Sequence, residues 1–132
     1  MEMEQIKWVR NELPKSDDKW LDVMSLENVA KARAFHRSFP QYSITPLDNL
    51  KGMANYMGVA GVYVKNESYR FGLNAFKVLG GSFAMARYIA QKTGKDVSEM
   101  TYDYLTSQQL KDEFGQATFF TATDGNHGRG VA

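Results

Sequence analysis

The fold of this chain is decided by the stretch Thr121-Ala122-Thr123-Asp124-Gly125-Asn126-His127-Gly128-Arg129-Gly130-Val131-Ala132. It follows an apolar, β-prone run, Ala117-Thr118-Phe119-Phe120, so we expect a strand over 117–122, then a turn, then a helix from about Asn126. A Gly-rich turn between a strand and a helix presents backbone N–H groups and short polar side chains to a ligand. Many α/β proteins have such a turn, so this stretch predicts a fold class better than a function.

Length and charge exclude several classes of protein. The 132 residues have the length of one domain, and 16 basic against 15 acidic residues leave a formal charge of +1. That balance argues against a nucleic-acid partner and against an anionic membrane surface. The chain has no Cys, and its two His lack the spacing of a metal site, so we expect no metal. With no secretory signal and no apolar run that could span a bilayer, we expect a cytoplasmic protein.

The order of elements is typical of an α/β fold. Residues 1–24 are interpreted as an N-terminal arm with a short strand around 6–9, and residues 25–132 as one domain. Ser25, Thr45 and Asn74 are the expected caps of three of the helices, and Gly94 is the expected end of the helix that follows Asn74. Helices are expected over 26–38, 45–57, 75–92, from 96 or 98 to 104, and over 106–114, and strands over 62–65 and 117–122. We therefore predict helices around a short, mostly parallel sheet.

The end of the chain indicates a partial domain. A helix that begins near Asn126 has room for only its first turns before Ala132, and such a short helix is marginal alone. The strand before it would also lack the crossover connection that a parallel sheet needs. We expect residues 25–132 to be the N-terminal part of a truncated domain, with a natural but frayed C-terminus as the alternative.

A second stretch, Asn74-Ala75-Phe76-Lys77-Val78-Leu79-Gly80-Gly81, contains a candidate nucleophile. Lys77 falls in the first turn of an expected helix, where the positive end of the dipole disfavours an ammonium, and burial would add to this. A free amine is what a nucleophilic Lys requires. Two Gly inside a helix cost about 1 kcal/mol each relative to Ala, which indicates close packing against the backbone. The alternative is a solvated surface Lys beside a tolerated Gly pair.

The polar residues of the terminal stretch have two interpretations. Asp124 and Asn126 are common turn formers, so they can serve only to shape the loop. His127 and Arg129 can help to bind an anion, but both also suit an exposed helix start. Taken alone, this stretch favours the structural interpretation.

Together the two stretches resemble the pyridoxal-phosphate enzymes of the tryptophan-synthase-β type (fold type II). Thr45-Pro46-Leu47 and Val64-Lys65-Asn66-Glu67-Ser68 also match that family. Arg70-Phe71-Gly72-Leu73-Asn74, Ala-Phe-Lys where relatives usually have Ser-Phe-Lys, and an Asp directly before Gly-Asn are similar to diaminopropionate ammonia-lyase in particular. The resemblance extends from about Leu26 to Ala132.

This resemblance implies roles for individual residues. Lys77 would bind pyridoxal 5'-phosphate covalently and, once displaced by the substrate amine, act as a base at the substrate α-carbon. Asn126 would bind the 3′-oxygen of the cofactor ring. Asp124 would act as a second base on the opposite face, so that both α-configurations react, and Asp124, Gly125 and His127 would bind the substrate. The reaction implied is α,β-elimination from 2,3-diaminopropionate to pyruvate and ammonia.

The resemblance also implies a homodimer that acts on a small amino acid. In that family the Gly-rich loop for the cofactor phosphate lies C-terminal to the loop seen here, so we expect this chain to be inactive alone. Two alternatives stay open. One is a threonine/serine dehydratase-like β-eliminase, and the other is a non-catalytic truncated chain.

Overall fold

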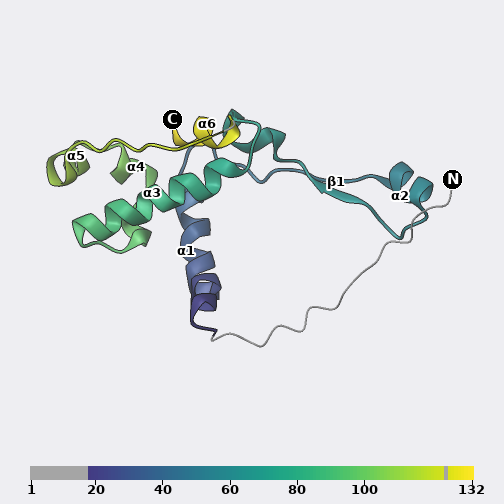
Figure 1. The fold of residues 1–132 in the computed structure, drawn as a ribbon, viewed down its shortest axis with the longest axis horizontal. Coiled ribbons are helices and arrows are strands. Elements are labelled where there is room, and N and C mark those ends of the chain that lie inside the picture. Colours follow the sequence, from purple (N-terminus) through teal and green to yellow (C-terminus); the bar gives the residue numbers. More distant parts are fainter. Residues whose placement is uncertain (1–17, 124) are drawn as a thin grey trace.

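A long helix, α3, lies at the centre of the molecule (Figure 1). The structure is a computed structural model and describes residues 18–123 and 125–132. The strand expected around 6–9 therefore lies outside the described residues, and the boundary between arm and domain stays a prediction. The elements follow the order η1 Asp18–Met24, α1 Leu26–Arg37, β1 Leu47–Asn49, α2 Lys51–Met57, β2 Tyr63–Lys65, η2 Glu67–Gly72, α3 Lys77–Thr93, η3 Val97–Glu99, α4 Tyr102–Leu105, α5 Gln108–Phe114 and α6 Asn126–Val131.

The helix α3 confirms the expected helix with a later start. It begins at Lys77 rather than Ala75, because Asn74 has a left-handed backbone (φ 57°) and does not cap it. It ends at Gly94, whose φ of 69° is the left-handed geometry that favours Gly. Ala86 and Ala90 are buried as expected, whereas Phe76 is 62% exposed. None of the described helices is both long and apolar enough to cross a membrane.

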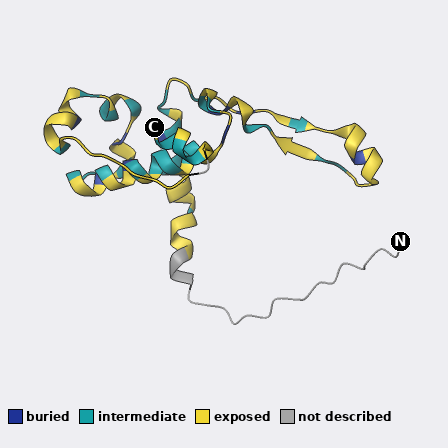
Figure 2. Cartoon of the chain, turned by 45° about the horizontal axis from the view of Figure 1, so that its top comes forward, coloured by how far each residue is buried: buried dark blue, intermediate teal, exposed yellow. Residues whose placement is uncertain are grey.

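The core is small and lies where α1 crosses α3. Its buried members are Phe35, Ala86, Ala90 and Met100. Much apolar surface stays in contact with solvent, and Leu26, Tyr56 and Phe120 are each about nine-tenths exposed (Figure 2). Large exposed apolar surfaces are typical of regions that contact further protein.

The described sheet is antiparallel, so the expectation of a mostly parallel sheet is wrong for this part of the chain. β1 pairs with β2 in the register Leu47 to Lys65, Asp48 to Val64 and Asn49 to Tyr63. The connection between the two strands contains only the short helix α2, and it turns the chain back on itself. A parallel pair would need a crossover from one end of the sheet to the other. The resulting hairpin extends away from α3, with α2 at its tip (Figure 1).

The helix expected over 45–57 is correct only in its second half. α2 begins at Lys51, and Thr45 does not cap it, because Thr45 is 2% exposed and its hydroxyl donates a hydrogen bond to Glu67 Oε1 (2.6 Å). The ladder between β1 and β2 takes the residues that the Thr-Pro signal had assigned to a first helical turn. Tertiary pairing here overrides a local capping signal.

The segment after α5 differs from its prediction. α4 and α5 confirm the two expected short helices, although α4 begins only at Tyr102. Residues 117–122, expected as a strand, are irregular and exposed and pair with no strand in the described part of the chain. A strand requires a neighbour to satisfy its backbone groups, and neither β1 nor β2 pairs with this segment.

Candidate functional site

The short helix α6 packs against the first turns of α3 (Figure 1). The approach is closest at Gly130, where an added β-carbon would lie 2.8 Å from the Val78 Cα atom. Facing it, a β-carbon on Gly81 would meet Val131 Cγ2 at 3.7 Å and His127 Cε1 at 3.8 Å. The two stretches singled out in the sequence are therefore brought together in space.

The Gly pair on α3 has a different role from the one expected. A β-carbon on Gly80 would meet nothing within 4 Å, and one on Gly81 would make only ordinary contacts. The close approach instead depends on Gly130 in the facing helix. The expectation that the Gly pair marks close packing against its own backbone is therefore wrong, and the residue that permits the close crossing lies on α6.

Lys77 is the first residue of α3, and it is exposed in this chain. From the sequence, burial of Lys77 is a second possible cause of a free amine. Burial is wrong for Lys77 in the described residues, whereas the alternative of an exposed lysine agrees with the structure. The preceding Ala75 is 8% exposed and anchors the chain just before the helix begins. Lys77 thus lies at a defined point, next to the crossing of α3 with α6.

The loop before α6 is held together by Thr123. Its Oγ1 accepts hydrogen bonds from the backbone N–H groups of Gly125 (3.0 Å) and Gly128 (2.8 Å). The close packing requires Gly at 128, because a β-carbon there would lie 2.5 Å from Thr123 Cγ2. Thr123 is not among the site residues predicted from the sequence, although Thr is a residue type that often accepts hydrogen bonds from backbone N–H groups at a helix start.

The expected site residues of this loop are only partly described. Gly125 and Asn126 are exposed at the start of α6, and His127 is half-buried beside Gly81. Asp124 lies outside the described residues, so its role as a second base stays a prediction. The roles of Gly125, Asn126 and His127 toward a ligand stay predictions as well.

The turn that precedes Lys77 has an unusual backbone. Phe71 (φ 49°), Gly72 (φ 70°) and Asn74 (φ 57°) are all left-handed, and Phe71 and Asn74 are the only residues other than Gly with positive φ in the described ranges. For residues other than Gly, such conformations cost about 1–3 kcal/mol each and persist only where the surroundings impose them. Something must therefore hold this turn in place.

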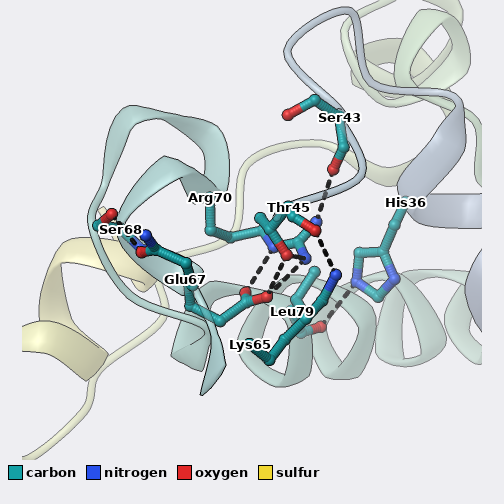
Figure 3. Close-up of polar contacts among 9 residues, drawn as sticks. His36, Ser43, Thr45, Lys65, Glu67, Ser68, Arg70 and Leu79 are labelled. Carbon is teal, nitrogen blue, oxygen red and sulfur yellow. Dashed lines mark hydrogen bonds and ion pairs between the residues drawn. The ribbon is translucent and has the colours of Figure 1, made fainter. Parts of the chain in front are cut away.

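An ion pair between the buried Arg70 and the partly buried Glu67 lies directly before the turn (Figure 3). Arg70, which is 7% exposed, donates from Nε to Glu67 Oε2 (2.7 Å) and from Nη2 to Glu67 Oε1 (2.9 Å). It also donates to Thr45 Oγ1 (3.1 Å) and to the Ser43 carbonyl (3.1 Å). A two-point contact of this kind fixes a guanidinium in both position and orientation. We call Thr45, Glu67 and Arg70 the arginine network.

The arginine network changes the acidity of Glu67. Hydrogen bonds from Arg70 are the main cause that lowers the pKa of the Glu67 carboxyl to about 2, against an opposing effect of burial. The hydrogen bond from Thr45 and the charge of Lys65 lower the pKa further. Glu67 is therefore ionised throughout the physiological pH range.

We predict that Glu67 makes the fold sensitive to acid. A carboxyl with a lowered folded-state pKa contributes stability above its unfolded-state pKa, and that contribution is lost as pH falls from about 4.5 to about 2. The contribution of Glu67 to the free energy of unfolding should drop by roughly 3 kcal/mol at most over that window. Urea titrations at pH 7, 4.5 and 2.5 should show that the free energy of unfolding falls more steeply with pH in the wild type than in Glu67→Gln. Equal slopes would contradict the prediction.

His36 ties α1 to the first turn of α3 (Figure 3). Its Nε2 lies 2.9 Å from the Leu79 carbonyl oxygen, and a carbonyl can only accept, so Nε2 carries the proton. Burial lowers the pKa of His36, which favours the neutral ring.

Comparison with known proteins identifies the relatives of this fold. No protein-family model matches the chain. It is 46% identical over 99 residues to diaminopropionate ammonia-lyase of Salmonella typhimurium and 47% identical over 102 residues to that of Escherichia coli K12. These matches cover 75% and 76% of this chain. The chain is homologous to the N-terminal portion of the diaminopropionate ammonia-lyases.

Solved structures agree with this relationship. The apo form of the Escherichia coli diaminopropionate ammonia-lyase matches 83% of this chain with a TM-score of 0.72 and 43% identity. The same enzyme in complex with an aminoacrylate–pyridoxal-phosphate azomethine intermediate matches 83% with a TM-score of 0.69 and 41% identity. The chain spans about a quarter of the length of the relatives, 24% of the two curated enzymes and 29% of the apo structure. The predicted relationship to diaminopropionate ammonia-lyase is thus confirmed.

Proposed function

We propose that this chain is the part of a pyridoxal-phosphate-dependent diaminopropionate ammonia-lyase that supplies the cofactor lysine and a second base. One observation supports this above the others: α6 packs on α3 at Val78, so the helix that begins with Asn126 adjoins the helix that begins with Lys77. The homology to diaminopropionate ammonia-lyases supports the same assignment.

The residues present suit the attachment of pyridoxal phosphate. Lys77 offers an exposed primary amine at a fixed helix start, and Asn126 offers an exposed amide at the start of the adjoining helix. When bound, the cofactor supplies an electron sink for the charge left on the substrate α-carbon. Since the chain spans about a quarter of its relatives' length, we propose that residues beyond it bind the cofactor phosphate.

The proposed residues divide the work of the reaction. Lys77 would hold the cofactor and then remove the proton from the substrate α-carbon on one face, and Asp124 would remove it on the other face for the opposite configuration. Asn126 would help to hold the cofactor ring through its side-chain amide, and the chain at Gly125 and His127 would bind the substrate carboxylate. Loss of the β-amino group as ammonia, followed by hydrolysis, gives pyruvate and a further ammonia.

A hybrid enzyme tests the proposed function. Residues 26–132 of this chain would replace the homologous segment of the Escherichia coli enzyme, and pyruvate release from 2,3-diaminopropionate would be measured. We expect turnover in the hybrid and none from the 132-residue chain alone. Serine in both configurations is the comparison substrate, because a dehydratase-like β-eliminase would prefer it. A hybrid that folds and binds pyridoxal phosphate yet turns over neither substrate would contradict the proposal.

We predict that Asp124→Asn separates the two substrate configurations. The amide keeps the size of the side chain but cannot accept the α-proton, so one enantiomer of 2,3-diaminopropionate should lose turnover by about 10²-fold or more. The other enantiomer should lose much less, since Lys77 serves it. Steady-state assays of the hybrid with each enantiomer measure the ratio, and an equal loss on both would remove the two-base assignment.

The assembly and location of the complete protein follow from the same proposal. We propose a cytoplasmic homodimer that acts on a small amino acid. Gel filtration of the hybrid with light scattering would measure its mass, and a monomer with full turnover would contradict the dimer.

A further inference from the structure

We infer that Arg70 and Glu67 are positioning residues that hold the strained turn before Lys77 and so fix the lysine amine. This inference rests on the proposed function, because it assigns the arginine network a role in how Lys77 meets the cofactor. The network contacts no reacting atom, so its effect passes through the backbone of residues 71–76.

The arginine network is built to hold Arg70 rigidly. Its guanidinium makes four hydrogen bonds to Glu67, Thr45 and Ser43, and it lies 5.7 Å from the ring centroid of Tyr42. In the described part of the chain no buried side-chain N or O atom lacks a partner, so the network is fully satisfied. A satisfied buried network over-determines the position of its members.

The constraint passes directly from Arg70 into the turn. The Arg70 carbonyl accepts the Leu73 N–H (2.8 Å), which closes the turn around the left-handed Phe71 and Gly72. The Phe71 ring packs on Phe39 at 5.9 Å between centroids. The strained backbone is thus held at its start by a side chain that cannot rotate.

The far end of the turn is held separately. His36 binds the Leu79 carbonyl, two residues beyond Lys77, from α1 (Figure 3). Lys77 therefore lies between two fixed points, Arg70 on one side and Leu79 on the other. Release of either point would let the start of α3 move.

The decisive experiment separates position from stability. Arg70→Met leaves the partly buried Glu67 carboxylate without its ion pair, which destabilises the fold. The double variant Glu67→Leu/Arg70→Met removes both charges and should recover the stability lost to the unpaired carboxylate, although the buried Thr45 hydroxyl then loses both of its network partners. If the network only stabilises the fold, the double variant also recovers the reactivity of Lys77. If it positions the turn, the reactivity stays low.

Reactivity is measured on the 132-residue chain with pyridoxal phosphate. The adduct is trapped with borohydride, and mass spectrometry gives the ratio of modification at Lys77 to that at the exposed Lys51 and Lys111. We expect this ratio to fall at least about tenfold in the double variant, because small displacements of a reacting group cost large factors in rate. Met100→Ala, which removes a core side chain and none of the hydrogen bonds of the arginine network, is the control for lost stability and should leave the ratio unchanged.

A second readout keeps the inference testable if Lys77 does not react. Amide exchange at Leu73 should accelerate at least about tenfold in the double variant and stay slow in Met100→Ala, relative to the global unfolding of each. If Lys77 of the wild type were not labelled in preference to the other lysines, this result would count against the proposed function. The amide exchange at Leu73 would still test whether Arg70 and Glu67 hold the turn. If the Leu73 amide exchanged as slowly in the double variant as in the wild type, the positioning role would be overturned. The same would follow if Met100→Ala accelerated Leu73 exchange, or lowered the labelling ratio of Lys77, as much as the double variant does.

Discussion

Replacing Lys77 with alanine is expected to abolish turnover of 2,3-diaminopropionate by the hybrid enzyme, with a loss of about 10²–10⁴-fold or more. That range is what a single positioned general base contributes, and Lys77 is also the proposed point of covalent attachment. Lys77 is exposed at the start of α3, so its removal should leave the packing of the helix intact. Pyruvate release measures the loss, and unchanged circular dichroism would show that the fold is retained.

Two further variants define what Lys77 contributes. Lys77→Arg keeps the positive charge but not a nucleophilic amine, so we expect it to be as inactive as Lys77→Ala. Lys51→Ala removes another exposed lysine, at the start of α2, and should leave turnover unchanged. Substantial activity in Lys77→Arg would mean that only the charge matters, and the assignment of Lys77 as the nucleophile would be withdrawn.

The elements with strong local signals could be predicted from the sequence. α1, α3 and α5 each have a clear cap or stop, such as Ser25 at the start of α1 and Gly94 at the end of α3, and the structure has them within about two residues. Local backbone preferences act within one or two turns, so they do not depend on the rest of the fold.

The elements that depend on distant partners could not be predicted in this way. The pairing of β1 with β2 converted the expected first turn at Thr45 into a strand, and residues 117–122 stayed irregular without a strand beside them. Strand pairing is non-local, so neither outcome is encoded in a short window.

The residues of the candidate site also divide into those with a local sequence signal and those that depend on distant partners. The sequence identified Lys77 and the loop after Thr123 as two separate motifs, and the structure brings their helices together. The sequence did not reveal the arginine network, because Thr45 lies 22 positions before Glu67, although Glu67 and Arg70 are three residues apart in η2. Residues that meet only because a hairpin folds back leave no periodic signal.

A Gly→Ala substitution is expected to have opposite effects on stability at two positions, Gly130 on α6 and Gly80 on α3. A methyl group at Gly130 would lie 2.8 Å from Val78 Cα and 3.1 Å from Val78 N, and backbone atoms cannot move aside as a flexible side chain can. Gly130→Ala should therefore displace α6 from α3, with the cost of about 1–3 kcal/mol that is usual for overpacking. At Gly80 the same methyl group meets nothing within 4 Å, so Gly80→Ala should stabilise α3 by about 1 kcal/mol.

The amides of α6 report the displacement directly. Arg129 N–H and Ala132 N–H donate to the carbonyls of Gly125 and Gly128, both at 2.9 Å, and their exchange should accelerate in Gly130→Ala but not in Gly80→Ala. In the hybrid enzyme, Gly130→Ala should lower turnover while the trapped adduct at Lys77 persists, because it moves the loop and not the lysine. If Gly130→Ala and Gly80→Ala behaved alike, α6 would not pack on α3 at Val78, and Asp124 and Asn126 would lose their proposed place beside Lys77.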